Sequence, residues 1–225
     1  LTALAAAELA IRAGIPAGVL NVITADGANS IAVGKVFCAS DTVRHISFTG
    51  STEVGRILMA QSAPTIKKLS LELGGNAPFI VFDDADVDSA VEGALASKYR
   101  NAGQTCVCAN RIYVQDGVYE QFVEKFAAKV RQMKVGNGFE EGVVQGPLIE
   151  DSAIEKVQRH VADAVAKGAK VVVGGEKLQD RFFQPTVLSG ATGDMLCARE
   201  ETFGPLAPVF RFHTEQEAID AANNT

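Results

Sequence analysis

The chain alternates between short apolar runs and longer stretches with a helical spacing of apolar and polar positions. The short runs are bounded by Gly, Pro, Asp or Ser, which is typical of strands buried on both faces of a parallel sheet. The longer stretches are rich in Ala, Leu and Glu or are amphipathic, and several begin after an acidic or small polar residue, as helices do. Because strand and helix alternate, the pattern predicts an α/β fold with a parallel sheet covered by helices.

In the first part of the chain the alternation predicts a helix followed by a βαβαβ unit. Predicted helices span residues 1–13, 28–39 and 53–60. Predicted strands span residues 19–24, 43–48 and 67–73. The flexible pair Gly74-Gly75 follows the last of these strands, so we place the domain boundary there.

The rest of the chain repeats the same style. Predicted strands span residues 79–82, 111–114, 169–173, 185–188 and 207–212. Predicted helices span residues 87–99, 119–134, 152–167 and 215–222, and residues 136–147 are expected to form a loop. The sequence therefore predicts two domains, residues 1–74 and residues 75–225.

Composition and charge exclude several classes of function. The net charge of −6 argues against a nucleic-acid-binding protein, which needs a basic face. No apolar run is long enough to cross a membrane. Four cysteines and three histidines without a CxxC pair do not form a zinc framework, so we expect no metal site. Free thiols fit a reducing compartment.

Candidate chemistry centres on the segment Arg100-Asn101-Ala102-Gly103-Gln104-Thr105-Cys106-Val107-Cys108. A cysteine is the best protein nucleophile near neutral pH when its thiolate is stabilised, and Cys106 follows a small polar run with a glycine. Upstream, Glu72 interrupts an apolar strand pattern, where it can serve in proton transfer if an apolar setting raises its pKa. On these residues alone, a buried cysteine and a strand-end glutamate paired with Lys67 or Lys68 remain an alternative.

Four blocks, in this order and spacing, resemble the aldehyde dehydrogenase superfamily and are most similar to its succinate-semialdehyde dehydrogenases. The blocks are Phe48-Thr49-Gly50-Ser51-Thr52-Glu53-Val54-Gly55, Leu71-Glu72-Leu73-Gly74-Gly75, Asn101-Ala102-Gly103-Gln104-Thr105-Cys106 and Glu200-Glu201-Thr202-Phe203-Gly204-Pro205. The similarity runs from Leu1 to Thr225. It implies a Rossmann-like, NAD(P)-binding part in residues 1–74 and an α/β catalytic domain in residues 75–225. Compared with the family, the chain resembles an internal fragment.

The resemblance also assigns roles. It implies that Cys106 is the nucleophile, Glu72 the general base and Glu201 a ligand of the nicotinamide ribose, with the ring of Phe203 packed on the sugar. It implies further cofactor contacts at Thr49, Gly50, Ser51, Gly34 and Leu73. The family's oxyanion-hole asparagine corresponds to sequence before Leu1, which leaves the backbone N–H of Cys106 as a donor; we interpret Asn101 as structural.

The loop at Gly50-Ser51 lies between a predicted strand and a predicted helix. The N–H groups at a helix N-terminus can bind a phosphate, and the resemblance implies the pyrophosphate site here. The motif is not the usual G-x-G-x-x-G fingerprint, however. Without the resemblance, Ser51 is more often a plain helix cap.

Two residues near Cys106 have a possible further role. Arg100 resembles the arginine that binds the distal carboxylate of the substrate in the succinate-semialdehyde branch; the alternative is a cation at a helix C-terminus. Cys108 is a possible redox partner of Cys106, although an i, i+2 disulfide would be strained; the alternative is a small buried apolar residue.

The resemblance implies NAD(P)-dependent oxidation of an aldehyde through a cysteine thiohemiacetal and thioester, with succinate semialdehyde as the leading substrate. Glutarate semialdehyde differs by one methylene and stays open. A CoA-acylating enzyme would lack the glutamate at position 72, and a non-catalytic scaffold would not need Cys106. The resemblance also implies a homotetramer or homodimer, a role in GABA degradation, and a cytoplasmic or mitochondrial-matrix location.

Overall fold

The computed structural model describes residues 1–225 and divides into two compact units, Leu1–Leu73 and Gly74–Thr225. The division lies next to the boundary predicted at Gly74-Gly75.

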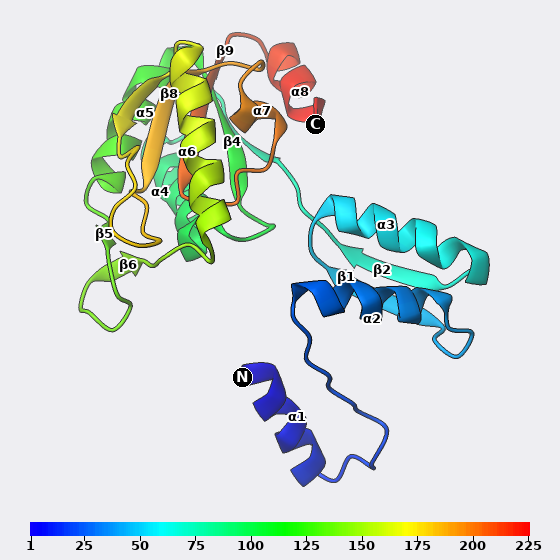
Figure 1. The fold of residues 1–225 in the computed structure, drawn as a ribbon. Helices are drawn as coiled ribbons and strands as arrows, with labels where there is room; N and C mark the ends of the chain where they lie inside the picture. The colour runs from blue at the N-terminus through cyan, green and yellow to red at the C-terminus, as the bar shows by residue number, and fades with distance from the viewer. The chain divides into compact units, whose positions relative to one another are not determined.

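The first unit is built on a pair of parallel strands, β1 (His45–Thr49) and β2 (Lys68–Glu72). Its helices are α1 (Thr2–Arg12), α2 (Gly27–Ala39) and α3 (Thr52–Ser62), and a short 3-10 helix, η1 (Ala63–Thr65), follows α3. α2 and α3 pack against each other beside the strand pair (Figure 1). Asp26 and Ser51 cap α2 and α3 by accepting bonds from backbone N–H groups.

The strand predicted over residues 19–24 is not formed. These residues are irregular, and Val19 and Ile23 are exposed. A strand exists only when its backbone pairs with a neighbouring strand, and residues 19–24 pair with neither β1 nor β2, the two strands of this sheet. The unit therefore contains two of the three strands predicted for it.

The second unit is built on a five-stranded sheet in the order β3-β4-β9-β8-β7. All neighbours are parallel except β7 and β8. The strands are β3 (Ala77–Val81), β4 (Ala109–Gln115), β7 (Lys170–Val173), β8 (Thr186–Ala191) and β9 (Leu206–Phe212). The helices are α4 (Val87–Tyr99), α5 (Asp116–Val130), α6 (Asp151–Ala166), α7 (Leu196–Arg199) and α8 (Glu215–Asn223), with η2 (Arg100–Gly103) directly after α4.

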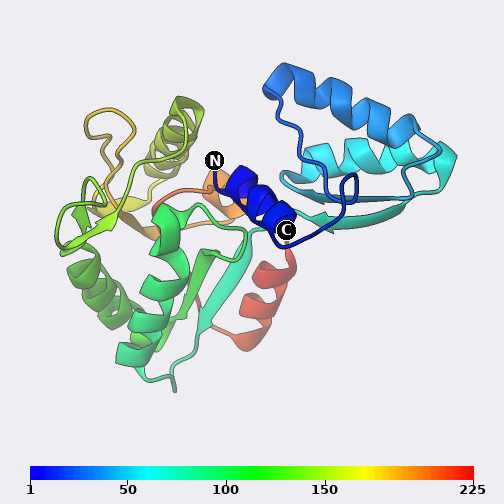
Figure 2. The same cartoon turned by 90° about the horizontal axis from the view of Figure 1, so that it is seen from below.

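Helices cover both faces of this sheet (Figures 1 and 2). Alternate strand residues face opposite sides, so Ile112 and Val114 pack with α4 and α5 while Tyr113 packs with α6 and α8. The result is a three-layer body of helices, sheet and helices, with one apolar core on each face of the sheet.

Two further elements differ from the prediction. Residues 136–147 were expected to form a loop, but residues 143–145 of this range form β6 (Val143–Gln145), which pairs with β5 (Lys134–Val135). The short helix α7 was not predicted, because four residues are too few to show a helical period.

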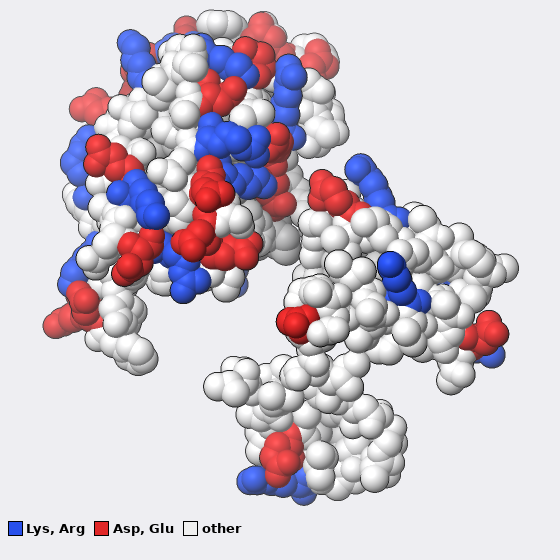
Figure 3. All heavy atoms as spheres, viewed as in Figure 1, with Lys and Arg blue, Asp and Glu red and all other residues white.

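The distribution of charged side chains differs between the units. On the face shown in Figure 3, acidic and basic side chains are interspersed over the second unit, while the first unit shows few charged groups. None of the helices combines the length and apolar character needed to cross a bilayer.

Candidate active site

The cysteine segment forms a tight left-handed turn at the end of α4. Asn101, Ala102 and Gly103 have φ values of 51°, 55° and 74°. Gly103 must be a glycine for a second reason, because a Cβ there would overlap the carbonyl oxygen of Gly204. The turn therefore packs directly on the Glu200–Pro205 segment, and two of the four sequence blocks meet here.

Side chains of the turn hold its backbone. The Asn101 amide donates to the carbonyl oxygen of Gln104 at 3.1 Å, and the Gln104 amide donates to that of Asn101 at 3.3 Å. Gln104 also accepts a bond from the N–H of Ile149 at 2.9 Å. The structural role predicted for Asn101 is confirmed. These hydrogen bonds hold the backbone that leads to Cys106.

The four cysteines are free, and only Cys106 is exposed. Cys38 and Cys197 are buried, and burial raises the pKa of Cys197 to about 12. A thiol that does not ionise is a poor nucleophile, so accessibility distinguishes Cys106.

Cys108 is 1% exposed and its sulfur packs against the end of α4. It lies 2.8 Å from the Thr105 hydroxyl and can donate to the carbonyl oxygen of Lys98 at 3.6 Å. These contacts fit a buried packing residue, and a reversible disulfide with Cys106 stays a prediction.

The other part of the candidate site is the Glu200–Pro205 segment, which joins α7 to β9. Phe203 has a left-handed φ of 53° and is 39% exposed, an unusual combination for an aromatic residue. The carboxylate of Glu201 lies against Gly74, where a Cβ would overlap its Oε2. Glu200 differs from it, since Glu200 pairs with Arg159 at 2.9 Å near the surface. The two adjacent glutamates are therefore not an equivalent solvated pair.

Glu72 is the last residue of β2, and it is exposed. The expected apolar setting is absent in the first unit, because a two-stranded sheet buries too little to enclose a side chain at its end. The alternative pairing with Lys67 is wrong, since that ammonium donates to the carbonyl oxygens of Ser40 and Val43.

The loop after β1 begins α3. Thr49 ends β1, Gly50 follows, and Ser51 caps the helix by accepting from the N–H of Val54 at 3.3 Å. A Cβ at Gly50 would overlap the ring of Phe48, so a larger residue there would force that ring to shift. The first-turn N–H groups of α3 and the Ser51 hydroxyl are the donor set that a phosphate needs.

The two remaining cofactor candidates have packing roles in the first unit. Leu73 packs on Gly55 of α3, where a Cβ would stand 2.6 Å from its Cδ2. Gly34 lies inside α2 and faces Leu58. Its N–H belongs to the interior of a helix, so it lacks the free donor of a helix N-terminus.

Arg100 lies directly after α4 and its side chain is exposed. Its guanidinium has no hydrogen bond or ion pair with another residue of the chain. An unpaired fork of N–H donors next to the cysteine turn can bind a carboxylate. The alternative, a cation at the helix C-terminus, also fits this position.

Three buried ionisable residues were not among the predicted site residues: Lys98, Arg111 and His160. Lys98 follows Val87, Val91 and Ala94 at helical spacing, and His160 shares the apolar face of α6 with Val157 and Ala164. A polar residue at a core-facing position was the available signal.

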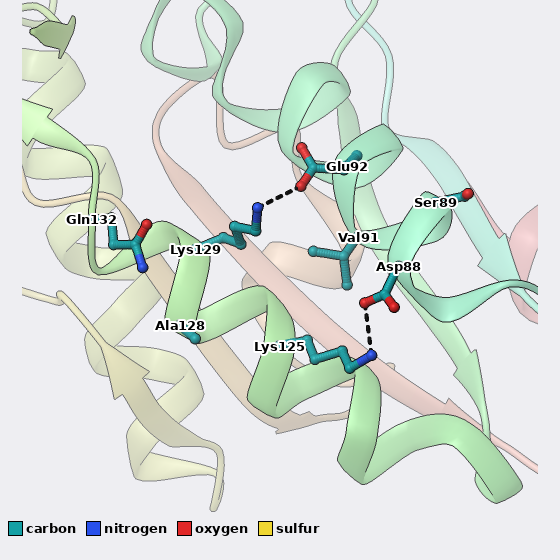
Figure 4. A pocket seen from close by; sticks show the side chains of 8 residues that line it. All are labelled: Asp88, Ser89, Val91, Glu92, Lys125, Ala128, Lys129 and Gln132. Atoms are coloured by element: carbon teal, nitrogen blue, oxygen red, sulfur yellow. Dashed lines mark hydrogen bonds and ion pairs between the residues drawn. The ribbon is translucent and has the colours of Figure 1, made fainter.

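A groove between α4 and α5 is separate from the candidate site (Figure 4). Its charged side chains pair with one another, Lys125 with Asp88 and Lys129 with Glu92. None of the predicted catalytic residues lines it, so we assign it no role in the chemistry.

Comparison with known proteins agrees with the resemblance seen in the four sequence blocks. The chain is 61% identical over 224 residues to a glutarate-semialdehyde dehydrogenase of Pseudomonas putida, with all of this chain and 46% of that protein covered. It is 60% identical over 227 residues to the NADP(+) succinate-semialdehyde dehydrogenase of Escherichia coli, again with all of this chain and 46% of that protein covered.

The fold agrees as well. The crystal structure of a succinate-semialdehyde dehydrogenase from Burkholderia pseudomallei superposes with a TM-score of 0.96 at 59% identity, covering 99% of this chain and 46% of that one. The chain thus spans about half the length of the relatives it matches. The model of the aldehyde dehydrogenase family matches residues 1–225, the whole sequence. The chain therefore belongs to the aldehyde dehydrogenase family, whose mixed α/β fold with parallel sheets it shares.

Proposed function

We propose that the protein containing this chain oxidises a small aldehyde with a distal carboxylate, using NAD or NADP. The observation that carries the proposal is the exposed Cys106 on a rigid left-handed turn that packs on the segment bearing Glu201. Succinate semialdehyde is the leading substrate, and glutarate semialdehyde is the alternative. Relatives named for each are almost equally similar, at 60% and 61% identity.

In the proposed reaction, the Cys106 thiolate attacks the aldehyde carbon. A C–S bond forms and the carbonyl oxygen becomes an oxyanion, to which the backbone N–H of Cys106 can donate. The nicotinamide nucleotide supplies the acceptor for the hydride that leaves this carbon. Loss of the hydride leaves a thioester on Cys106.

Glu72 completes the reaction. Its carboxylate takes a proton from water, the hydroxide oxygen attacks the thioester carbon, and the C–S bond breaks. The products are the carboxylic acid and the Cys106 thiolate, and Glu72 returns its proton to solvent. Arg100 binds the distal carboxylate and orients the substrate.

The residues present fit a nicotinamide nucleotide. The N-terminus of α3 with Gly50 and Ser51 offers donors for a pyrophosphate. The Glu201 carboxylate can accept hydrogen bonds from two ribose hydroxyls, and the exposed ring of Phe203 can pack on a sugar. Either nucleotide fits the prediction, and a homo-oligomeric state stays a prediction.

The test measures aldehyde oxidation by a full-length protein that contains this chain. Succinate semialdehyde, glutarate semialdehyde and propanal are each assayed with NAD and with NADP, in the parent and in Cys106→Ser. We expect a carboxylate-bearing aldehyde to have the highest kcat/KM and Cys106→Ser to abolish turnover. Equal activity of the serine variant, or the best kcat/KM for propanal, would overturn the proposal.

A further inference from the structure

One buried imidazole contacts both neighbours of Glu201. His160 of α6 is fully buried; its Nδ1 lies 3.0 Å from the Thr202 hydroxyl and its Nε2 lies 3.2 Å from a Glu200 carboxylate oxygen. Glu200 has extended backbone, with φ −111° and ψ 137°. Neighbouring side chains of an extended segment point to opposite sides. Glu200 and Thr202 therefore face α6, and Glu201 faces away from it, toward Gly74.

The two contacts define the state of the imidazole. An ionised carboxylate only accepts hydrogen bonds, so Nε2–H donates to Glu200. Nδ1 of the neutral ring then accepts from the hydroxyl of Thr202. Burial lowers the pKa of His160 and favours this neutral form, although the Glu200 carboxylate opposes the shift. Thr202 is 2% exposed, and this bond satisfies its hydroxyl.

The carboxylate of Glu201 also interacts by charge with a buried cation, Lys98. Lys98 is fully buried, and its ammonium donates to Asn110 Oδ1 at 2.9 Å. The Asn110 amide in turn donates to the carbonyl oxygen of Gly75 at 3.3 Å. Burial lowers the pKa of Lys98 to about 8, while the negative charge of Glu201 acts in the other direction. The orientation of Glu201 thus places its carboxylate where a fixed positive charge attracts it.

Neighbouring residues of α6 strengthen the attachment. Val157, one turn before His160, occupies the space that a side chain at Gly204 would need. The segment is therefore held against α6 on both sides of Phe203. Arg159 also binds Glu200, but its side chain is exposed and it does not reach Thr202.

We propose that His160 is a positioning residue for the nucleotide site: by holding Glu200 and Thr202 on α6, it directs the Glu201 carboxylate to the side of Gly74 and Lys98. The proposal rests on the proposed function, in which Glu201 binds the nicotinamide ribose. His160 itself touches neither nucleotide nor aldehyde, so its effect is on affinity for the nucleotide.

The test titrates NADH and NADPH into a full-length protein containing this chain, without aldehyde, and follows nucleotide fluorescence. Loss of one buried hydrogen bond predicts a Kd about tenfold higher in His160→Leu and in Thr202→Val. The double variant should bind no more weakly than His160→Leu alone, because that variant already lacks the contact with Thr202. His160→Asn should recover much of the affinity, since its amide lies near the position of Nδ1. Arg159→Ala is the matched control and should bind like the parent.

Steady-state kinetics separate positioning from general damage. We expect KM for the nucleotide to rise in His160→Leu while KM for the aldehyde stays within about twofold. Parental nucleotide affinity in His160→Leu, or equal rises in both KM values, would overturn the inference. Thr202→Val keeps the shape of the side chain, so it decides the matter if His160→Leu does not fold.

Glu201→Gln distinguishes this inference from the proposed function. If Glu201→Gln leaves nucleotide affinity unchanged, the ribose role of Glu201 is wrong and the role of His160 fails with it, while the reaction at Cys106 is tested separately by Cys106→Ser. If Glu201→Gln weakens binding while His160→Leu and Thr202→Val do not, only the role of His160 fails.

Discussion

At the scale of single residues, Glu72 has a role that kinetics can isolate. Glu72→Gln removes the base but not the nucleophile, so thioester hydrolysis should slow much more than its formation. We expect a burst of reduced nucleotide, about one per site, followed by slow turnover in stopped-flow absorbance. Glu8→Gln, a surface change on α1, is the control. A parental steady-state rate would show that another group activates water.

Arg100 is exposed and unpaired, so its predicted partner is the substrate. Arg100→Ala should raise KM for succinate semialdehyde about tenfold or more, because a charge-assisted hydrogen bond is lost. KM for propanal, which has no carboxylate, should stay near the parental value. Equal changes for the two aldehydes would leave Arg100 with the helix-end role instead.

His160 also makes stability depend on pH. Its pKa is lowered in the folded state, whereas the imidazole of the unfolded chain keeps a pKa of about 6.5. As pH falls through that value, the unfolded chain binds a proton that the folded chain does not, so the free energy of unfolding decreases. As the pH is lowered from about 7.5 to about 5.5, the melting temperature of the parent should therefore fall more steeply than that of His160→Gln. Parallel pH profiles would contradict this assignment.

At the scale of elements, Arg111 attaches α8 to the sheet. This buried guanidinium on β4 donates to the carbonyl oxygens of Ala221 and Ala222 at 2.7 and 2.8 Å, and to that of Asn76 at 2.7 Å. It thus satisfies the free carbonyl groups at the end of α8. Arg111→Leu leaves them unsatisfied and should cost about 3 kcal/mol.

Amide hydrogen exchange measures this effect separately for each helix. We expect amides of α8 to exchange faster in Arg111→Leu, while those of α5, on the other face of the sheet, change less. Arg211→Leu, at an exposed arginine of β9 paired with Asp116 and Glu120, is the matched control. Equal exchange of α8 in the two variants would show that other contacts hold the helix.

Elements with local signals were predictable from the sequence. The start of α4 is marked by Asp86, whose carboxylate accepts from the N–H of Ser89, and the predicted bounds match. The strand predicted over residues 19–24 failed because strand formation depends on a partner, which local sequence does not reveal. The contact of Gly103 with Gly204 joins segments about a hundred residues apart, so no local pattern could give it.

The candidate site divides in the same way. The cysteine turn and the Glu201 segment stood out as sequence blocks, and the structure brings them together. Lys98 and His160 were not assigned to the site. They occupy positions on the apolar faces of their helices, and the helical period predicted the helices without indicating a role for these two polar residues. Their partners lie on other elements, at Asn110 and Thr202.

At the scale of the whole molecule, the two units differ in how much they bury. The second unit holds both apolar cores, while in the first unit only Cys38, Gly55 and Ser62 are buried. Because stability follows buried apolar surface, residues 1–225 produced alone should be cut by protease first within Leu1–Leu73. Mass spectrometry of early fragments checks this. Early cleavage inside β4 or β9, with the first unit intact, would reverse the ranking.

The strand order of the second unit also bears on how the chain folds during synthesis. β9 lies between β4 and β8, although it is the last strand to be made. Until residues 206–212 leave the ribosome, β3 with β4 and β7 with β8 are separate pairs with open edges. The segment that carries Glu201 directly precedes β9, so the cysteine turn acquires its packing partner in the same late step. Nascent chains paused before residue 206 should therefore bind chaperones that recognise exposed strand edges.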